Sequence, residues 1–398
     1  MMTLVGQPTR KCRPCEDARV RLAWLALLLV ACGGDLTPAR LALVPADDLV
    51  IVAHQDDDLL FMQPDIRDIV EHHRPLTVVY VTAGDNQSGL AYAQGRYRAL
   101  RAAYSQVAGA RDWGCQWIKL ARHAAELCRL GSVSLVFLGY PDGGMSGEWQ
   151  HSLLKLWDGV LQRAPTVAKR PATYTRKGLI ATLEEIVEIT RPTVIRTLEV
   201  AATHGPDHSD HMIVGALTAY VVMTAAPKVK LLAYRGYSTM TEPANEDFER
   251  SSLMMRAYSA CVSRCGVCEQ RPCDRVEDPR FDQFVRRRYI VGSRVPPFEG
   301  RLQLGDKCLG RGSKLVPCDQ AVRVAFLETG EVRAGDECLL GDCGRKFMLD
   351  EEGHLFVGQV IRGASLYEHI ACVFVEGYAL RVDRCGGEHA TRWTLASP

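Results

Sequence analysis

The sequence lacks the long apolar runs of a membrane-spanning protein. Its longest uninterrupted apolar stretch, residues 22–32, has eleven residues, which is about half of what a helix needs to cross a bilayer. It also lacks an excess of charge of either sign, because 48 Lys and Arg face 47 Asp and Glu and leave a net charge of +1. No overall positive field therefore attracts nucleic acid. We expect a water-soluble body without a nucleic-acid partner.

Cysteine, by contrast, is abundant. The chain has 398 residues, 47% of them hydrophobic and 24% charged, which fits two or three folded domains of roughly 150 residues each. Fifteen cysteines are too many for an ordinary reduced cytosolic enzyme without a metal cluster. The number is odd, so simple pairing leaves one cysteine over.

The apolar run at residues 22–32 has the features of an export signal. Arg19 and Arg21 precede it, and small residues follow, as in the positive and cleavage regions of a signal peptide. Residues 29–33, LVACG, resemble the lipobox of bacterial lipoproteins. The resemblance implies a signal peptide over residues 1–32 and lipidation of Cys32. A short buried helix is the alternative.

Beyond a linker at residues 33–46, short apolar runs alternate with helix-length stretches. The expected strands are residues 49–53, 76–81, 133–138, 193–197 and 231–235, and the expected helices are residues 94–107, 179–190, 211–223 and 248–260. Continuous apolar runs of strand length belong to strands that are covered on both faces. We therefore expect an α/β domain over residues 47–294: a Rossmann-like, mostly parallel sheet with helices on both faces, and with its chemistry at the carboxyl edge of the strands.

Two clusters of potential metal ligands follow expected strands. The first is AHQDDDLL, residues 53–60, and the second is HGPDHSDH, residues 204–211. Three carboxylates and an imidazole at a strand end repel one another unless a cation neutralises them. Two ligands from the first cluster and one from the second would leave a fourth position open, as in catalytic zinc sites. Either cluster alone would be read as a solvated turn or a surface loop.

These clusters resemble the signatures of a known family. AHQDDDLL is similar to the AHPDDE signature of the PIG-L (LmbE-like) deacetylases, and HSDH, residues 208–211, is similar to their HPDH signature. Further similarity lies at residues 81–85, at the helix that carries Arg96, and at residues 137–143. The resemblance extends over about residues 49–260.

The resemblance implies a role for each matched residue. One Zn²⁺ ion per chain, or another divalent metal, would be bound by His54, Asp57 and His211, with Asp56 as the general base. His208 would be an imidazolium that stabilises the oxyanion or protonates the leaving amine. Three further residues are then candidates: Asp210 as a catalytic residue that orients an imidazole or alternatively caps the helix, and Arg96 and Asp85 as substrate contacts. A helix-surface ion pair is the alternative for Arg96, and His204 is an extra histidine without a role.

The chain departs from the first signature at two positions. Gln55 stands where the signature has Pro, and we expect this change to loosen the bend that aims Asp56. Asp58 stands where the signature has Glu and is one methylene shorter. Neither change removes a metal ligand or the general base.

A repeated pattern follows the proline pair at residues 296–297. Residues 300–309 recur thirty residues later, with five identities in ten positions, and a looser third copy starts at Gly353. The copies contain the cysteine pairs Cys308–Cys318, Cys338–Cys343 and Cys372–Cys385, followed by Phe326, Phe347 and Trp393 respectively. Residues 298–398 thus resemble a β-trefoil of the ricin-B lectin type. Such a domain could bind glycan or be purely structural.

The cysteine count can now be explained. Cleavage before Cys32 removes Cys12 and Cys15, and lipidation uses Cys32, so 15 − 3 leaves twelve cysteines. In an exported protein we expect these to form disulfides. The pairs are Cys115–Cys128, the three pairs of the repeats, and two more among Cys261, Cys265, Cys268 and Cys273. A metal cluster in residues 261–273 is the alternative in a reduced protein.

The sequence therefore predicts an exported enzyme, either a bacterial envelope lipoprotein held to the membrane by its N-terminal lipid or a secreted protein. The resemblance implies a zinc-dependent hydrolase that removes an N-acetyl or N-acyl group from an N-acetylglucosamine-like sugar or glycoconjugate. Two alternatives stay open. One is a carbohydrate-binding surface lipoprotein with an inactive α/β domain, and the other is an amidase that acts on a related glycoconjugate.

Overall fold

The computed structural model describes residues 41–199, 207–237, 247–263, 279–358, 370–383 and 391–397. The expected signal peptide with Cys32, His204, and the cysteines at 265, 268, 273 and 385 lie outside these residues. Within the described part of the chain, no helix combines the length and the apolar character needed to cross a bilayer.

The described residues of the α/β domain contain an eight-stranded sheet of order β10-β9-β8-β1-β2-β5-β4-β3. Its five central strands run parallel, and β10, β4 and β3 pair antiparallel at the edges. The strands are β1 Asp48–Val52, β2 Leu76–Thr82, β3 Gly114–Leu120, β4 His123–Leu130, β5 Val133–Tyr140, β8 Val194–Leu198, β9 Lys230–Tyr234 and β10 Ile290–Gly292. The expected α/β sheet with a parallel centre is confirmed.

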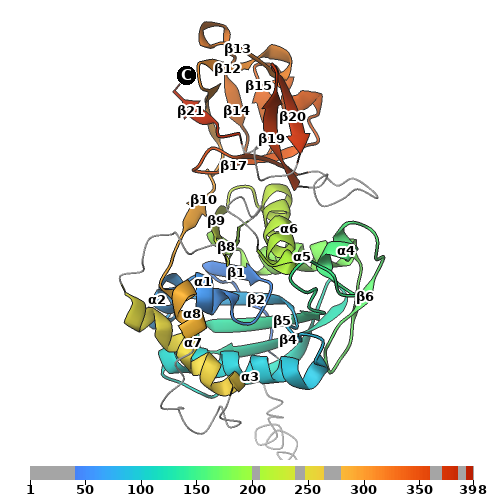
Figure 1. Ribbon diagram of the computed structural model, residues 1–398, viewed down its shortest axis with the longest axis vertical. Helices are drawn as coiled ribbons and strands as arrows, with labels where there is room; N and C mark the ends of the chain where they lie inside the picture. The colour runs from blue at the N-terminus through green and yellow to red at the C-terminus, as the bar shows by residue number, and fades with distance from the viewer. Residues whose placement is uncertain are drawn as a thin grey trace, which may run out of the picture. The chain divides into compact units, whose positions relative to one another are not determined.

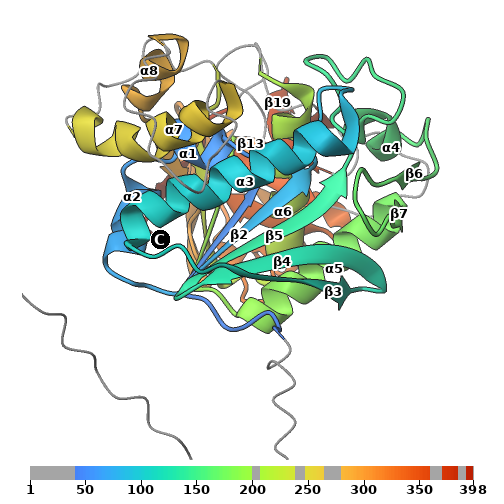
Figure 2. The same ribbon diagram turned by 90° about the horizontal axis from the view of Figure 1, so that it is seen from below.

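Helices cover both faces of this sheet (Figures 1 and 2). On one face lie α1 Asp57–Phe61, α2 Asp65–Glu71, α3 Gly89–Ala108, α7 Phe248–Ser263 and α8 Pro279–Val285; on the other lie α4 Leu153–Trp157, α5 Arg176–Thr190 and α6 Ser209–Ala225. A short ribbon of β6 Ala164–Pro165 and β7 Thr173–Tyr174 lies beside the main sheet.

Burial on both faces explains why the central strands read as continuous apolar runs. All five residues of β1 are buried. Leu49 and Ile51 pack into the core beneath α5 and α6, whereas Val50 and Val52 pack into the core beneath α3 and α7. Successive side chains of a strand point to opposite faces, so each face needs its own apolar residues.

The hairpin of β3 and β4 is an element that the sequence analysis missed. Its strands are only partly buried and carry polar residues such as Gln116, Lys119 and Glu126, so no apolar run identifies them. Cys115 and Cys128 lie directly opposite each other across the two strands and form a disulfide. This is one of the expected pairs.

The C-terminal part of the chain is rich in antiparallel sheet. Its described residues form an eleven-stranded sheet of β11 Phe298–Leu304, β12 Lys307–Gly310, β13 Lys314–Pro317, β14 Val324–Phe326, β15 Val332–Ala334, β16 Glu337–Cys338, β17 Lys346–Leu349, β18 Leu355–Gly358, β19 Ile370–Glu376, β20 Ala379–Asp383 and β21 Thr394–Ala396. Short 3₁₀ turns lie at Arg311–Ser313, Cys318–Gln320 and Leu339–Gly341.

The repeats contribute equivalent residues to this region. Phe326, Phe347 and Trp393, the aromatic residues of the three copies, are buried in one apolar core. Cys308–Cys318 and Cys338–Cys343 form disulfides. Cys372 is also disulfide-bonded, and its expected partner, Cys385, lies outside the described residues. A trefoil arrangement of the copies stays a prediction.

Candidate metal centre and active site

The two ligand clusters meet at the carboxyl edge of neighbouring strands. His54 lies two residues beyond the end of β1, and α1 begins at Asp57. β1 pairs in parallel with β8, and α6, which follows β8 in the chain, carries His211 in its first turn. Because parallel strands end at the same edge of a sheet, residues 157 positions apart lie side by side.

Three ligand atoms converge at this edge. Nδ1 of His54 and Nε2 of His211 are 3.1 Å apart, and Oδ1 of Asp57 lies 3.1 Å from the His211 nitrogen and 3.6 Å from the His54 nitrogen. Ligands of a tetrahedral zinc ion at about 2.0–2.1 Å lie about 3.3 Å from one another. The three atoms therefore have the spacing that such an ion requires.

The Asp57 carboxylate also fits a cation. Its Oδ2 accepts a hydrogen bond of 2.7 Å from the backbone N–H of His54, whereas its Oδ1 is buried and has no hydrogen-bond partner among the described residues. A buried carboxylate oxygen needs compensating positive charge, and here only the two imidazole nitrogens lie within ion-pair distance among the described residues. A bound cation between Asp57, His54 and His211 would satisfy it.

The outward-facing nitrogen of each imidazole contacts a carboxylate. Nδ1 of His211 lies 2.9 Å from Oδ1 of Asp207, and Nε2 of His54 lies 3.3 Å from Oδ2 of Asp210. A carboxylate that accepts the outer N–H leaves the inner nitrogen with a lone pair, as metal-binding histidines require. The sequence analysis missed Asp207, although its spacing of four residues from His211 was a usable signal.

Electrostatic effects on these groups follow from the same contacts. Burial lowers the pKa of His54, but the negative charges of Asp57 and Asp210 outweigh it and raise the pKa to about 9. Burial likewise lowers the pKa of His211, and Asp57 and Asp207 raise it well above its usual value. In the absence of a cation, protons neutralise this cluster of carboxylates, and a metal ion would have to replace them.

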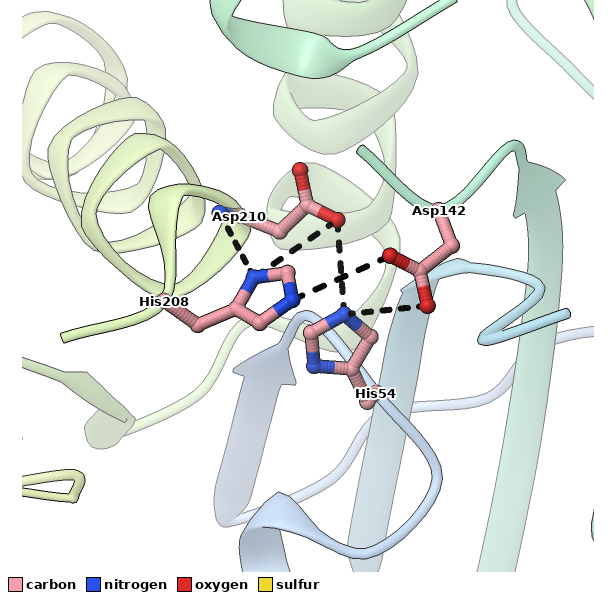
Figure 3. Close-up of side chains that lie close together, drawn as sticks. All are labelled: His54, Asp142, His208 and Asp210. Carbon is pink, nitrogen blue, oxygen red and sulfur yellow. Dashed lines mark hydrogen bonds and ion pairs between the residues drawn. The ribbon is translucent and has the colours of Figure 1, made fainter. Parts of the chain in front are cut away.

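A second group lies on the other side of the His54 ring (Figure 3). Nε2 of His54 is 3.3 Å from Asp210 and 3.9 Å from Oδ2 of Asp142, and Nε2 of His208 is 3.8 Å from Oδ1 of Asp142. These four side chains could also hold a metal ion. A neutral imidazole has one lone pair, so His54 can serve only one of the two groups. The shorter distances between ligand atoms favour the triad of His54, Asp57 and His211.

His208 lies at the N-terminus of α6, beside His54 and Asp142. Burial, together with positive charge on His54 and His211, lowers the pKa of His208 to about 2. Its Nδ1 accepts a hydrogen bond of 3.1 Å from the backbone N–H of Asp210. The proton of the neutral ring must then lie on Nε2, which faces Asp142.

Asp56 is held by an arginine from α3. Nη2 of Arg96 lies 2.5 Å from Oδ1 of Asp56, Nη1 donates to the carbonyl of Gly84 at 2.9 Å, and Nε donates to the hydroxyl of Tyr258 at 2.7 Å. The Arg96 side chain is 11% exposed. This is a part-buried ion pair with a residue of the strand-end loop, so the helix-surface pair considered for Arg96 is wrong.

A cavity of about 310 Å³ opens above these residues, at the lower end of the range for small-molecule sites. Its walls are formed by His54, Asp56, Asn86, Tyr92, Arg96, Asp142, His208, Tyr237, Tyr258, Ser259, Val262 and Phe281. Polar groups from the strand ends thus face aromatic and apolar groups, most of which come from α7 and α8.

A comparison with protein families agrees with this geometry. Residues 49–222 match the model of the family described as PIG-L: GlcNAc-PI de-N-acetylase. This segment is a PIG-L domain. Tyr237, Tyr258 and Phe281, which line the cavity, come from the chain beyond the matched segment.

Solved structures resemble parts of the chain. A deacetylase–teicoplanin complex from teicoplanin biosynthesis is 13% identical, with 47% of this chain and 68% of that chain covered and a TM-score of 0.29. A conserved protein from Thermus thermophilus is 17% identical, with 56% and 83% covered and a TM-score of 0.30. A deacetylase–bog complex from the same biosynthesis pathway is 11% identical, with 54% and 84% covered and a TM-score of 0.33. No curated protein matches the chain.

The remaining expected site residues of the PIG-L domain lie behind the cavity wall. Asp85 does not line the cavity as an expected substrate contact would; its Oδ1 accepts a hydrogen bond of 3.1 Å from the backbone N–H of Asp142. Asp210 is fully buried and also accepts from the backbone N–H of Gly143 at 2.9 Å. The helix cap is His208, not Asp210. Asp142 was overlooked, although it lies in the turn that directly follows β5.

Proposed function

We propose that this chain is a zinc-dependent hydrolase that removes an N-acetyl or N-acyl group from an N-acetylglucosamine-like sugar or glycoconjugate. The observation that carries the proposal is the convergence of His54, Asp57 and His211 on one point, with a buried Asp57 oxygen that has no hydrogen-bond partner among the described residues. Asp56 and His208 line the adjoining cavity. The description of the matched family supports the choice of bond and of sugar.

When bound, the metal ion would supply a water molecule of lowered pKa and would polarise the amide carbonyl. Asp56 lies beside the triad without belonging to it. Arg96 contacts its Oδ1, which leaves Oδ2 as the oxygen that can accept the proton of the attacking water. Oδ2 can later deliver this proton to the leaving nitrogen, so that the proton balance closes.

His208 supplies a hydrogen bond to the other side of the reacting group. His208 lines the cavity, and because its Nδ1 accepts the backbone N–H of Asp210, the proton of a neutral ring lies on Nε2. A donor fixed in this way can stabilise the negative charge that develops on the carbonyl oxygen. Its position at the N-terminus of α6 adds the favourable field of the helix dipole.

Two further assignments rest on the sequence. We propose that the C-terminal sheet is a ricin-B-like β-trefoil that binds glycan. We also propose that Cys32 carries the lipid of a bacterial envelope lipoprotein. Binding of the isolated leaderless protein to immobilised glycans, and the mass of the mature N-terminus, test these two assignments separately.

The deciding experiment combines metal analysis with acetate release from N-acetylglucosaminyl substrates by the leaderless protein. We expect about one zinc ion per chain, acetate release that a chelator abolishes, and loss of release in Asp56→Ala with zinc still bound. No acetate release across a broad glycan panel would favour a carbohydrate-binding protein with an inactive α/β domain. Release of a different acid would identify another N-acyl group, whereas products from cleavage of a different amide bond would point to an amidase.

A further inference from the structure

Gln55, the residue between His54 and Asp56, is fully buried although it is polar. Its side-chain Nε2 donates a hydrogen bond of 2.6 Å to the backbone carbonyl of Thr82. Thr82 is the last residue of β2, the strand that pairs with β1. The side chain therefore ties the loop that carries His54 and Asp56 to the end of the neighbouring strand.

The same end of β2 also holds the start of this loop. The backbone N–H and the hydroxyl of Thr82 both donate to the carbonyl of Ala53, at 3.0 Å and 2.9 Å. Ala53 and Gln55 lie on either side of His54. The turn is thus held on both sides by one residue.

Gln55 and Arg96 meet over Gly84. Gly84 has φ +52°, and a Cβ at this position would overlap with both the Gln55 Oε1 and the Arg96 Nη1. Arg96 itself donates to the Gly84 carbonyl and to Asp56. Asp56 is therefore restrained in two ways. Gln55 precedes it in the chain and fixes its backbone, and the guanidinium of Arg96 forms an ion pair with its side chain.

We propose that Gln55 is a positioning residue for Asp56, and that its hydrogen bond to Thr82 replaces the restraint of the proline ring in the resembling signature. Proline restrains this turn by fixing φ, whereas Gln55 restrains it through its side chain. The inference rests on the proposed function. A displacement of about 1 Å at a reacting group can cost a hundredfold in rate, so a single tie at this position can determine kcat.

The test compares Gln55→Met, which keeps the volume and removes the donor, with Gln55→Pro. Gln116→Met is the matched control. Gln116 lies on the distant strand β3, and its side-chain amide also donates to a backbone carbonyl, that of Leu41. Zinc affinity, thermal unfolding, kcat and KM for acetate release are measured for each variant. Both Gln55 variants leave the Thr82 carbonyl without the Gln55 donor, so we expect them to lose similar thermal stability.

The expected result is a kcat reduced about ten- to a hundredfold in Gln55→Met, with KM and zinc affinity within about threefold of the wild type. Gln55→Pro regains most of the kcat, and Gln116→Met keeps it. If folded, zinc-loaded Gln55→Met has the wild-type kcat, or if Met and Pro variants fold and lose kcat equally, the proposal is overturned.

A double-mutant cycle tests the link to Asp56 directly and does not depend on whether the proline variant folds. In an Asp56→Asn background, Gln55→Met should change the residual kcat less than about twofold, because the carboxylate that Gln55 positions is already absent. An equal fold-loss in both backgrounds overturns the proposal. Failure of the proposed function looks different: the wild type itself would release no acetate while still binding zinc.

Discussion

Arg96 and Asp56 form a part-buried ion pair in which Nη2 lies 2.5 Å from Oδ1. The arginine is fixed from two further sides, by the carbonyl of Gly84 at the end of β2 and by the hydroxyl of Tyr258 on α7. The candidate general base is therefore held by elements from three separate parts of the chain. One of them, α7, lies beyond the segment that matches the PIG-L family.

We predict that Arg96→Lys lowers kcat about tenfold and leaves zinc affinity unchanged. A lysine has one compact charge and cannot contact Asp56, Gly84 and Tyr258 together as the planar guanidinium does. Acetate-release kinetics and a zinc titration check this. Arg98→Lys, an exposed position on the same helix, is the control and should be neutral. If Arg96→Lys and Arg98→Lys had equal kcat values, Arg96 would have no role in positioning Asp56 for catalysis.

We predict that Asp207→Asn weakens zinc binding about ten- to a hundredfold, because the carboxylate that accepts the His211 Nδ1–H orients the ring and increases its basicity. Competition with a chromogenic chelator measures the affinity. At saturating zinc the variant should regain most of its activity. Asp112 is exposed, and Asp112→Asn serves as the control. If Asp112→Asn weakened zinc binding as much as Asp207→Asn does, the argument would be contradicted.

His208→Asn should separate the two tasks of this residue. Asparagine is a favourable helix cap, so α6 and the thermal stability of the protein should persist. The side chain is shorter and lacks the Nε2–H that borders the cavity, so we expect kcat to fall about ten- to a thousandfold with zinc content unchanged. Thermal unfolding, zinc content and kcat decide it. A large loss of stability with normal kcat would assign His208 to structure alone.

Asp58→Asn should change how stability depends on pH. Burial raises the pKa of Asp58 from 3.8 to about 7, although Tyr104 and Tyr80 donate hydrogen bonds to its carboxylate. Between these values the folded protein keeps a proton that the unfolded chain has lost, so stability falls as pH rises. With a chelator present, the variant and the wild type should unfold at similar temperatures near pH 4. The variant should be a few degrees more stable near pH 8, and a gap independent of pH would contradict this.

Local sequence was sufficient for much of this molecule. The central strands could be predicted because a strand covered on both faces must be apolar at every position, as β1 is. Clustered carboxylates and imidazoles after two strands predicted a cation site because they need a counter-charge, and the resemblance to the PIG-L signatures implied His54, Asp57 and His211 as its ligands. By contrast, the half-exposed β3–β4 hairpin has no such pattern, and only its cysteine pair indicated it.

The sequence by itself thus predicted two clusters of potential metal ligands and the sheet edge at which they meet. Only the tertiary structure decided how they act. It placed Asp142 and Asp207 against the histidines, lowered the pKa of His208 by burial, and joined Gln55 to Thr82 and Arg96 to Asp56. The physical reason is that protonation and orientation depend on partners brought together across strand ends, and no local pattern of residue types contains those distances.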